Sequence, residues 1–355
     1  LTIAAVESLT GNTYRGSAYT GTYTTNALGA DAAGLTVTGL ATGINAGTYR
    51  SSLVASGAVL ANYNTPTIND ANLVISPKAV TITNAASSTT YDGATRYADL
   101  MNSAGFTNTA LVGSDSIASV TQTATVSGST VTGVAQAGTF VSTPSAAVMG
   151  VGLVTNYAFT YQTATNAVAK ANLSVTAANA TKTYNGLAYT GGNGVTYSGL
   201  VNNEASTVLT GTLAYSGTSQ NSVDAGSYVI TPSGLSSNNY NISYANGTLT
   251  VNKATLTVTA NAQSRVYGDA NPSFTQTIAG FVNGQTLATS GVTGSAYGST
   301  TTTAASNVGT YTITASANGL SSANYQFTTT NGILTVNARP ITVTADAKTK
   351  VYGSA

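Results

Sequence analysis

Hydrophobic and polar residues alternate with a period of two along much of this chain. Leu256-Thr257-Val258-Thr259 and Tyr311-Thr312-Ile313-Thr314 are clear examples. Because successive side chains of a strand point to opposite faces, this alternation predicts strands with one buried face. No helical period runs beyond about one turn, and the short polar segments around Glu204 and Gly284 are candidates for one turn each. The pattern therefore predicts an all-β chain.

Two Asn-Gly pairs lie between alternating runs. Asn246-Gly247 separates residues 242–244 from 249–251, and Asn331-Gly332 separates 325–327 from 334–336. An Asn-Gly pair in this setting favours a two-residue turn in which both residues have positive φ. The sequence therefore predicts a β-hairpin at each pair.

Four landmarks recur along the chain in a fixed order. The first is a Tyr beside a Gly: Tyr14-Arg15-Gly16, Tyr91-Asp92-Gly93, Tyr184-Asn185-Gly186, Tyr267-Gly268-Asp269 and Tyr352-Gly353. The second is Gly-x-aromatic: Gly47-Thr48-Tyr49, Gly138-Thr139-Phe140, Gly226-Ser227-Tyr228 and Gly309-Thr310-Tyr311. The third is Asn-Tyr: Asn62-Tyr63, Asn156-Tyr157, Asn239-Tyr240 and Asn324-Tyr325. The fourth is an apolar strand that runs into the next unit: 73–78, 167–170, 249–253 and 334–338.

The landmarks repeat at the scale of a small domain. The spacing is 92 residues from Lys78 to Lys170, 83 from Lys170 to Lys253, and 85 from Lys253 to Ala338. A β-helix would repeat about every 20 residues, so each unit here is a whole domain and not a rung. The division expected is five segments: 1–77, 78–169, 170–252, 253–337 and a truncated unit at 338–355.

The second landmark indicates the kind of domain. Residues 224–228 resemble the tyrosine corner of immunoglobulin-like sandwiches, in which a Tyr hydroxyl bonds back to the preceding backbone. Ile230 and Ile313 follow two residues later, where such domains place a core residue, whereas Ser51 and Ser142 stand there in the first two units. We therefore expect a tandem array of immunoglobulin-like β-sandwich domains of about 85 residues and roughly seven strands each.

Composition removes several classes of function. The 355 residues include no Cys, His or Trp, which excludes thiol nucleophiles, Cys or His metal sites and Ser-His-Asp relays. Charged residues make up 6% of the chain and the formal net charge is +1, so no strong field attracts nucleic acid or anionic lipid. No apolar run approaches the ~20 residues of a membrane-spanning helix. We expect no enzyme activity, no cofactor, no nucleic-acid partner and no membrane insertion of this segment.

Carboxylates offer little chemistry. The chain has ten Asp and Glu residues and no Asp-rich loop, and a calcium site needs several oxygen ligands together. Asp31 and Asp269 would supply one ligand each, so both are interpreted as solvated turn residues and no metal site is expected. Lys78, Lys170 and Lys253 occupy equivalent junction positions. They are interpreted as edge-strand lysines that discourage unwanted strand pairing.

Tyrosines are the candidates for recognition, because their rings stack well on sugars and on proteins. Tyr91, Tyr184 and Tyr267 lie beside turns and are the candidate ligand contacts, although packing is the favoured role even there. The other landmark tyrosines are assigned structural roles, at a corner or at a strand entry: Tyr49, Tyr228, Tyr311, Tyr63, Tyr240 and Tyr325.

The landmarks together resemble the MBG and YDG repeats of large bacterial surface adhesins. Residues 266–272, followed by 280–285, are similar to the MBG type, which suggests an MBG-type domain at 253–337. Tyr91-Asp92-Gly93 and Tyr184-Asn185-Gly186 are similar to the YDG type, which suggests YDG-type domains at 78–169 and 170–252. The resemblance implies a secreted or cell-surface protein related to filamentous haemagglutinin, a role in cell adhesion and biofilm, and an outer-membrane transporter as export partner. It implies no catalytic residues.

Two functions remain open at this point. One is a structural stalk or spacer that projects an adhesive region from the cell. The other is an array of modules, each binding a host or matrix glycan, matrix polysaccharide or protein. The stretch after Tyr91 differs greatly from that after Tyr267, and such drift favours the spacer. Only residues 252–255 separate two predicted strands at the third junction, and so short a link predicts a restricted angle between neighbouring domains.

Overall fold

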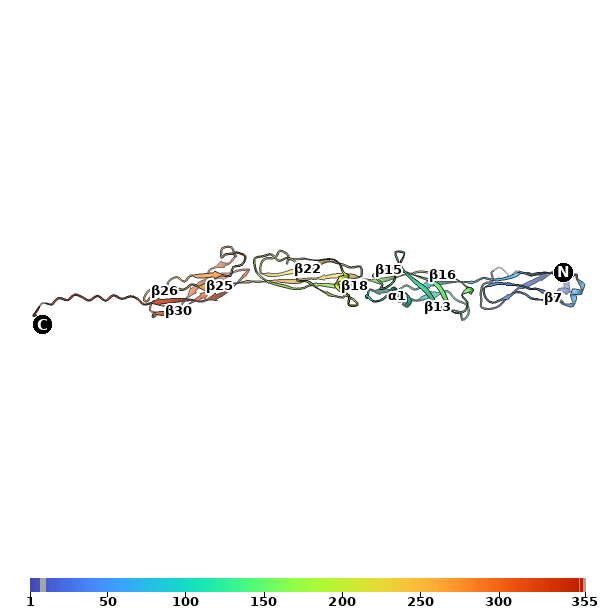
Figure 1. Cartoon of the computed structure of the whole chain (residues 1–355), viewed down its shortest axis with the longest axis horizontal. Coiled ribbons are helices and arrows are strands. Elements are labelled where there is room, and N and C mark those ends of the chain that lie inside the picture. Colours follow the sequence, from blue (N-terminus) through green and yellow to red (C-terminus); the bar gives the residue numbers. More distant parts are fainter. Residues whose placement is uncertain (7–10, 351, 354–355) are drawn as a thin grey trace. The chain divides into compact units, whose positions relative to one another are not determined.

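A computed structural model describes residues 1–6, 11–350 and 352–353 (Figure 1). The segment expected as a truncated fifth unit, 338–355, therefore lies partly outside the described residues. By their internal contacts the described residues form two compact units. One comprises Leu1–Asn172, Leu200–Val208 and Ser237–Asn241. The other comprises Leu173–Gly199, Leu209–Ser236 and Ile242–Ala355. We refer below to the segments 1–77, 78–169, 170–252 and 253–337 as the first to fourth repeats.

The third repeat has seven strands in two sheets. They are β18 (Ala171–Ala177), β19 (Ala180–Thr183), β20 (Val195–Ser198), β21 (Thr210–Ser216), β22 (Gly226–Ser236), β23 (Tyr240–Ala245) and β24 (Gly247–Asn252). One sheet has the order β20-β18-β23 and the other β19-β24-β22-β21. A single 3-10 turn, η4 (Ser206–Val208), follows Glu204.

The fourth repeat has the same arrangement. Its main strands are β25 (Ala254–Ala260), β26 (Gln263–Val266), β27 (Gln276–Ala279), β29 (Tyr297–Ser299), β30 (Gly309–Ser316), β32 (Tyr325–Thr330) and β33 (Gly332–Asn337). The sheets are β27-β25-β32 and β26-β33-β30-β29. Two further short strands pair with each other, β28 (Thr293–Gly294) and β31 (Leu320–Ser321).

The second repeat extends this plan. Its strands are β10 (Lys78–Asn84), β11 (Ser88–Thr90), β12 (Phe106–Asn108), β13 (Ser116–Val126), β14 (Ser129–Thr130), β15 (Gly138–Val151), β16 (Tyr157–Gln162) and β17 (Ala164–Ala169). They form the sheets β12-β10-β16 and β11-β17-β15-β13-β14. The 3-10 turn η3 (Val154–Asn156) precedes β16.

The first repeat consists of smaller sheets. Its strands are β1 (Thr2–Val6), β2 (Tyr19–Thr20), β3 (Thr22–Thr25), β4 (Thr36–Thr38), β5 (Thr42–Gly43), β6 (Gly47–Arg50), β7 (Val54–Ser56), β8 (Thr67–Asn69) and β9 (Asn72–Ile75). They form the sheet β3-β1-β8 and the pairs β2-β5, β4-β7 and β6-β9. Two 3-10 turns complete the repeat, η1 (Gly29–Ala32) and η2 (Ala58–Asn62).

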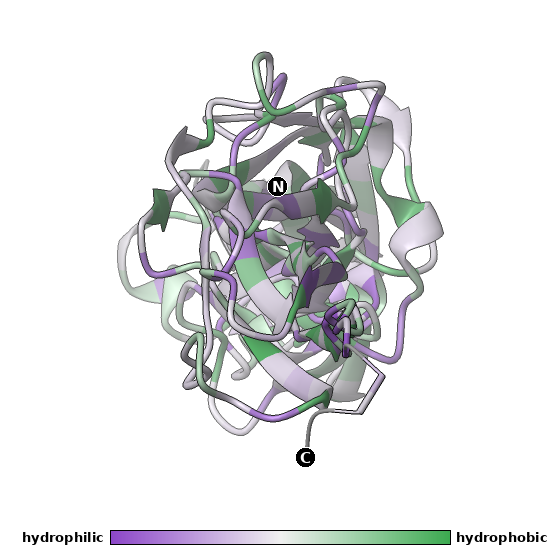
Figure 2. Ribbon diagram, turned by 90° about the vertical axis from the view of Figure 1, so that its left-hand side faces the viewer, coloured by the Kyte–Doolittle hydropathy of each residue, from purple (hydrophilic) through white to green (hydrophobic). Residues whose placement is uncertain are grey.

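The cores follow from the alternation in the sequence. Along β25, Ala254, Leu256 and Val258 are buried while the threonines between them face outward. Bands of hydrophobic and hydrophilic residues follow one another along the ribbon in Figure 2. The outward threonines also pair across strands, as Thr257 does with Thr328. Burying each Leu or Val stabilises a repeat by about 1.5–3 kcal/mol relative to exposure, and hydroxyl groups solvate the other face in place of charges. The predicted all-β immunoglobulin-like class is confirmed.

Serine replaces isoleucine in two cores without leaving orphaned polar atoms. Ile230 and Ile313 are fully buried in the third and fourth repeats. The hydroxyl of Ser51 donates to Asp70 over 2.9 Å, and that of Ser142 accepts from Asn166 over 3.1 Å. A buried hydroxyl costs little once it is hydrogen-bonded, so the sandwich tolerates serine there.

The second repeat contains a helix that the sequence pattern missed. Helix α1 (Tyr97–Ala104) has two turns and buries Tyr97, Leu100 and Met101. Asp99 accepts the backbone N–H of Arg96 at the start, and Gly105 ends the helix with φ 71°. The expectation of no helix beyond one turn is therefore wrong here. Eight residues are too few to show a helical period in the sequence, and the contacts at the two ends set the limits of the helix.

The two Asn-Gly pairs do not form hairpins. The strands β23 and β24 that flank Asn246-Gly247 belong to different sheets, as do β32 and β33 around Asn331-Gly332. Neither pair has positive φ. A Cβ on Gly247 would lie 2.6 Å from the carbonyl oxygen of Ala177, so this glycine permits close approach between backbones. The hairpin prediction is wrong because the pairs mark a change of sheet.

Alternation at Ile341-Thr342-Val343 predicts an opening strand for the truncated fifth unit, and the structure has no strand there. Residues 338–350 carry no strand, and Ile341 and Val343 are 83% and 88% exposed. A single strand needs a neighbour for its backbone hydrogen bonds, and none pairs with it among the described residues.

Candidate functional site: the junctions between repeats

A carboxylate joins two tyrosines at each of the first two junctions. At the first, Tyr14 and Tyr157 both donate to the same oxygen of Asp115, over 3.0 and 2.6 Å. Tyr14 belongs to the first repeat, whereas Asp115 and Tyr157 belong to the second. The three residues lie within one compact unit. The arrangement links the Tyr-x-Gly landmark of one repeat to the Asn-Tyr landmark of the next.

The second junction repeats this geometry with a glutamate. Tyr91 of the second repeat donates to one oxygen of Glu204, and Tyr240 donates to the other, each over 2.5 Å. Glu204 and Tyr240 belong to the third repeat, and all three residues lie in the same unit. Hydrogen bonds to an ionised carboxylate are shorter and stronger than neutral ones.

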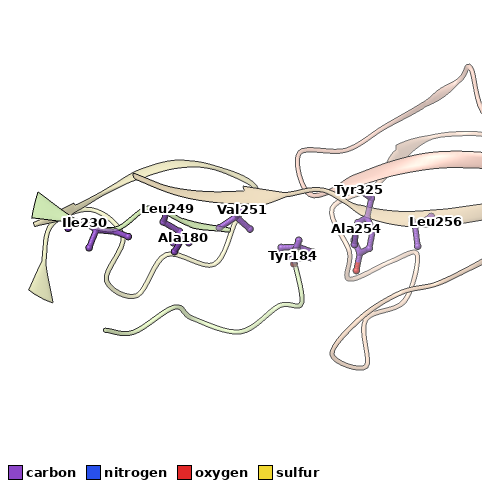
Figure 3. Packing of buried hydrophobic residues seen from close by; sticks show 9 residues of the cluster. Ala180, Tyr184, Ile230, Leu249, Val251, Ala254, Leu256 and Tyr325 are labelled. Carbon is purple, nitrogen blue, oxygen red and sulfur yellow. The ribbon is translucent and has the colours of Figure 1, made fainter. Parts of the chain in front are cut away.

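A glutamine does the same at the third junction. Gln285 donates to the hydroxyl of Tyr184 over 2.9 Å and accepts from Tyr325 over 2.5 Å. Figure 3 shows Tyr184 between the buried residues of its own repeat and Ala254, Leu256 and Tyr325 of the next, and these residues form one apolar cluster. An amide both donates and accepts, so this junction holds its tyrosines without a charge.

The tyrosine rings meet edge to face at every junction. The ring centroids of Tyr14 and Tyr157 are 5.5 Å apart at 81°. The later pairs have nearly the same geometry: Tyr91 and Tyr240 at 5.7 Å and 82°, and Tyr184 and Tyr325 at 5.4 Å and 79°. Edge-to-face pairs contribute about 0.5–1.5 kcal/mol beyond the area that they bury.

Burial raises the pKa of the tyrosines at the first two junctions. Burial, with the hydrogen bond to Glu204, raises the pKa of Tyr91 to about 12. Burial and the hydrogen bond to Asp115 raise the pKa of Tyr157 to about 12. Tyr14 and Tyr240 also have raised pKa values, first because of burial and then because of their acidic partners. A tyrosine with a raised pKa remains a donor throughout the physiological range.

The glycine of the Tyr-x-Gly landmark lets the next repeat approach. A Cβ on Gly16 would lie 2.8 Å from a methyl group of Val112. One on Gly93 would lie 3.2 Å from Val201, and one on Gly186 would lie 2.8 Å from the Cβ of Asn283. All three glycines have φ between 69° and 75°, a region that other residues rarely adopt. Both the space and the backbone conformation therefore require glycine.

A second contact uses the Asn of the Asn-Tyr landmark. Its side-chain oxygen accepts the N–H of the alanine before the Gly-x-aromatic landmark of the preceding repeat. The pairs are Ala46 with Asn156 at 2.8 Å, Ala137 with Asn239 at 2.9 Å and Ala225 with Asn324 at 2.7 Å. Each junction is thus bonded at two separate points, and two such contacts restrict rotation more than one does.

Two of the junction lysines have a defined role. Lys170 donates to the carbonyl of Ser237 over 2.8 Å, and Lys253 donates to that of Ser322 over 2.7 Å. Each lysine is the single residue between the closing strand of one repeat and the opening strand of the next. Its ammonium group therefore satisfies a carbonyl of the loop before the Asn-Tyr landmark.

The structure separates the three candidate ligand contacts. Tyr91 and Tyr184 are 6% and 4% exposed and point into junctions, so neither ring presents a face to solvent. Tyr267 is 41% exposed, and its hydroxyl has no hydrogen-bond partner in the part of the chain that the structure describes. The packing role favoured for the first two agrees with their burial, and ligand contact by Tyr267 stays a prediction.

The corner tyrosines bond as the sequence predicts. The hydroxyls of Tyr228 and Tyr311 donate to the carbonyls four residues earlier, Asp224 and Asn307, each over 2.9 Å. Tyr49 does the same to Asn45 over 3.0 Å. In the second repeat Phe140 has no hydroxyl, and its ring packs edge-on against Tyr97 of α1.

Replacing Tyr228 or Tyr311 by alanine should destabilise its own repeat by about 2–4 kcal/mol, through the lost ring contacts and the lost hydrogen bond. Tyr→Phe at either position should cost about 1 kcal/mol, because only the hydrogen bond is removed. Thermal and urea unfolding of the full chain measure both. Alanine variants that unfold like the parent would show that the corner contributes nothing.

Other site types find little support in the described residues. No three acidic side chains are placed to hold a metal ion within them. No helix in that part of the chain is long and apolar enough to cross a membrane. A cleft of about 330 Å³ lies beside α1 in the second repeat, with Arg96, Tyr97, Met101 and Gln122 among its lining residues.

Several solved structures match the chain, but the similarity is slight. The I-band fragment I67–I69 of titin matches with 8% identity and a TM-score of 0.22, covering 74% of this chain and 97% of that one. Drosophila N-cadherin EC1–4 matches with 8% identity and a TM-score of 0.21, covering 82% and 83%. Similarities at this level carry no functional argument. No curated protein matches the sequence.

A family model matches the chain twice in tandem. It describes the MBG domain of YGX type and covers residues 173–250 and 256–335. The two matches fall on the third and fourth repeats, including the third, for which the sequence suggested the YDG type. The resemblance to MBG-type repeats is confirmed for these two repeats. Residues 173–250 and 256–335 of this chain are MBG domains of the YGX type.

Proposed function

We propose that this segment is a non-enzymatic spacer in a secreted or cell-surface bacterial adhesin, which holds its repeats at restricted angles and thereby projects an adhesive region. The observation that carries the proposal is the Tyr–acceptor–Tyr contact, which recurs with the same ring geometry at all three junctions. A module that only binds ligands independently gains nothing from such contacts between repeats.

The short links support the same proposal. Lys253 alone lies between β24 and β25, and Lys170 alone between β17 and β18. A link of one residue leaves few conformations, whereas a flexible tether needs a longer Gly- and Ser-rich segment. The link and the two bonded points at each junction act together, so a change of angle must break buried hydrogen bonds.

Small-angle scattering on residues 170–337, with and without Gln285→Ala, tests the spacer. We expect the parent distance distribution to have a sharp maximum dimension, near twice that of one repeat, which a single arrangement fits. Gln285→Ala should broaden it. The matched control is Gln220→Ala, which removes an amide of the third repeat that bonds to Gly191 within that repeat. A parent distribution fitted only by freely jointed domains would reject the spacer.

The alternative is a glycan-binding module. The cleft beside α1 favours it for the second repeat, because that helix is absent from the other repeats in the described residues. Glycan-array binding of the full chain, lost on Tyr97→Ala or Gln122→Ala but kept on Tyr267→Ala, would support this function. The export partner in either case would be an outer-membrane transporter.

A further inference from the structure

The second, third and fourth repeats each contribute four equivalent side chains to a junction. We call this set of four side chains the receiving half. It consists of a Val, an acid or amide three residues later, and the Asn and Tyr of the Asn-Tyr landmark. The sets are Val112, Asp115, Asn156 and Tyr157; Val201, Glu204, Asn239 and Tyr240; Val282, Gln285, Asn324 and Tyr325. In each set the backbone N–H of the Val donates to the Tyr hydroxyl over 3.0–3.1 Å.

The first repeat carries a matching set. The N–H of Leu28 donates to the hydroxyl of Tyr63 over 2.9 Å, and this hydroxyl donates to Asp31 over 3.0 Å. Asp31 again follows three residues after the apolar residue, and Asn62 precedes the tyrosine. Gly29 has φ 45°, close to the 50–56° of Asn202, Asn283 and Gly113 at the same position. The first repeat therefore has a receiving half.

Within the part of the chain that the structure describes, no other repeat covers this receiving half. Leu28 is 74% exposed, whereas Val112, Val201 and Val282 are all partly buried. Asn62 is exposed, and its side chain has no hydrogen-bond partner among the residues that the structure describes, unlike Asn156, Asn239 and Asn324. The face thus presents a solvent-exposed apolar residue, a carboxylate and an amide in the arrangement that elsewhere holds a tyrosine.

We propose that the face formed by Leu28, Asp31, Asn62 and Tyr63 binds the Tyr-x-Gly end of a repeat placed directly before it in the polypeptide. The tyrosine hydroxyl donates to Asp31, the glycine packs against Leu28, and the side-chain oxygen of Asn62 accepts a backbone N–H. This inference rests on the role of the junctions in the proposed function.

The connection favours a repeat in the same polypeptide over a second copy of the chain. At all three junctions the repeat that gives the tyrosine directly precedes the receiving one, through a link of one or two residues. Such a link supplies a high effective concentration. Leu1-Thr2-Ile3 also matches Leu256-Thr257-Val258, with Ile3 and Val258 both fully buried. A closing strand that continues into β1 would therefore keep the register seen at the third junction.

An extended chain tests the proposal. A copy of residues 78–255 is placed directly before Leu1, so that copied Thr255 precedes Leu1 as it precedes Leu256. Hydrogen exchange followed by mass spectrometry is compared between the chain, the extended chain and the extended chain with Leu28→Asp. Leu28 is exposed in the unextended chain, so Leu28→Asp tests the contact with the extension and not the fold of the first repeat.

We expect exchange at residues 28–32 and 60–63 to slow about tenfold or more in the extended chain, and Leu28→Asp to abolish the change. Equal exchange with and without the extension overturns the proposal. So does fast amide exchange in the extension when the same residues, 78–255, exchange slowly at their native position. Concentration-dependent association of the unextended chain that Leu28→Asp removes would show that a second copy is the occupant. The scattering experiment on residues 170–337 tests the spacer separately. A sharp distance distribution there supports the spacer whichever of these results is obtained.

Discussion

Replacing Glu204 by alanine should cost about 3 kcal/mol of unfolding free energy, because two buried tyrosyl hydroxyls lose a charged acceptor at once. Tyr91 and Tyr240 both donate to Glu204, and both rings are buried. Tyr91 then has no alternative partner in its own repeat, whereas Tyr240 keeps the N–H of Val201 as a donor to its hydroxyl. Denaturant unfolding followed by tyrosine fluorescence measures the change. The chain has no Trp, so no tryptophan emission overlaps the tyrosine signal.

The chain offers a matched control in its own third junction. Gln285 already holds two tyrosines without a charge, so Glu204→Gln should cost less than about 1 kcal/mol. A double-mutant cycle of Glu204→Ala with Tyr91→Phe isolates the contact across the junction, and a coupling of about 1 kcal/mol or more is expected. Equal losses for the Gln and Ala variants would mean that the hydrogen bonds at this position do not stabilise the protein.

Strand positions and the corner could be predicted because their causes are local. Alternation along residues 256–259 depends only on which face of one strand is buried. The corner at Tyr228 bonds to a carbonyl four residues away. Such short-range causes leave a pattern that is readable in a single sequence, even at this low level of charge.

The junction acceptors could not be predicted because their causes are long-range and their chemistry varies. Asp115, Glu204 and Gln285 share no residue type, and they precede the tyrosine of the Asn-Tyr landmark by 42, 36 and 40 residues. Each also bonds a tyrosine more than 100 residues away in sequence, in the preceding repeat. The signal available was a Val three residues before each acceptor, and this signal has meaning only once the backbone N–H of the Val is known to bond to the tyrosine hydroxyl.

The place where Tyr91 and Tyr184 pack could not be predicted for the same reason. A Tyr beside a Gly is typical of turns, and turns usually lie at the surface. Tyr91 and Tyr184 are buried because the next repeat covers them, so their exposure depends on a neighbour and not on the turn. Tyr267 shows the other case. Its backbone N–H donates to the carbonyl of Asn337, just as those of Tyr91 and Tyr184 donate to the carbonyls of Ala169 and Asn252. Its side chain is nevertheless exposed.

The difference between covered and uncovered tyrosines leads to the largest expected effect. Tyr325 is almost completely buried, packs edge-on against Tyr184 and Phe281, and bonds to Gln285 and to the N–H of Val282. Tyr325→Ala should lower the unfolding free energy of the fourth repeat by about 3–5 kcal/mol, the usual cost of deleting a buried aromatic side chain. That is a large fraction of the roughly 5–15 kcal/mol that stabilises a small domain, and the chain has no disulfide to compensate.

Two variants separate the causes of that loss. Tyr325→Phe keeps the ring and removes the hydroxyl, so it should cost about 1–2 kcal/mol, including the acceptor lost by Val282. Tyr267→Ala removes an exposed tyrosine from the same repeat and should change stability by less than about 0.5 kcal/mol. Calorimetry of the full chain should show one transition moved far down by Tyr325→Ala and left in place by Tyr267→Ala. If the two alanine variants melt alike, the buried ring of Tyr325 does not stabilise the fourth repeat.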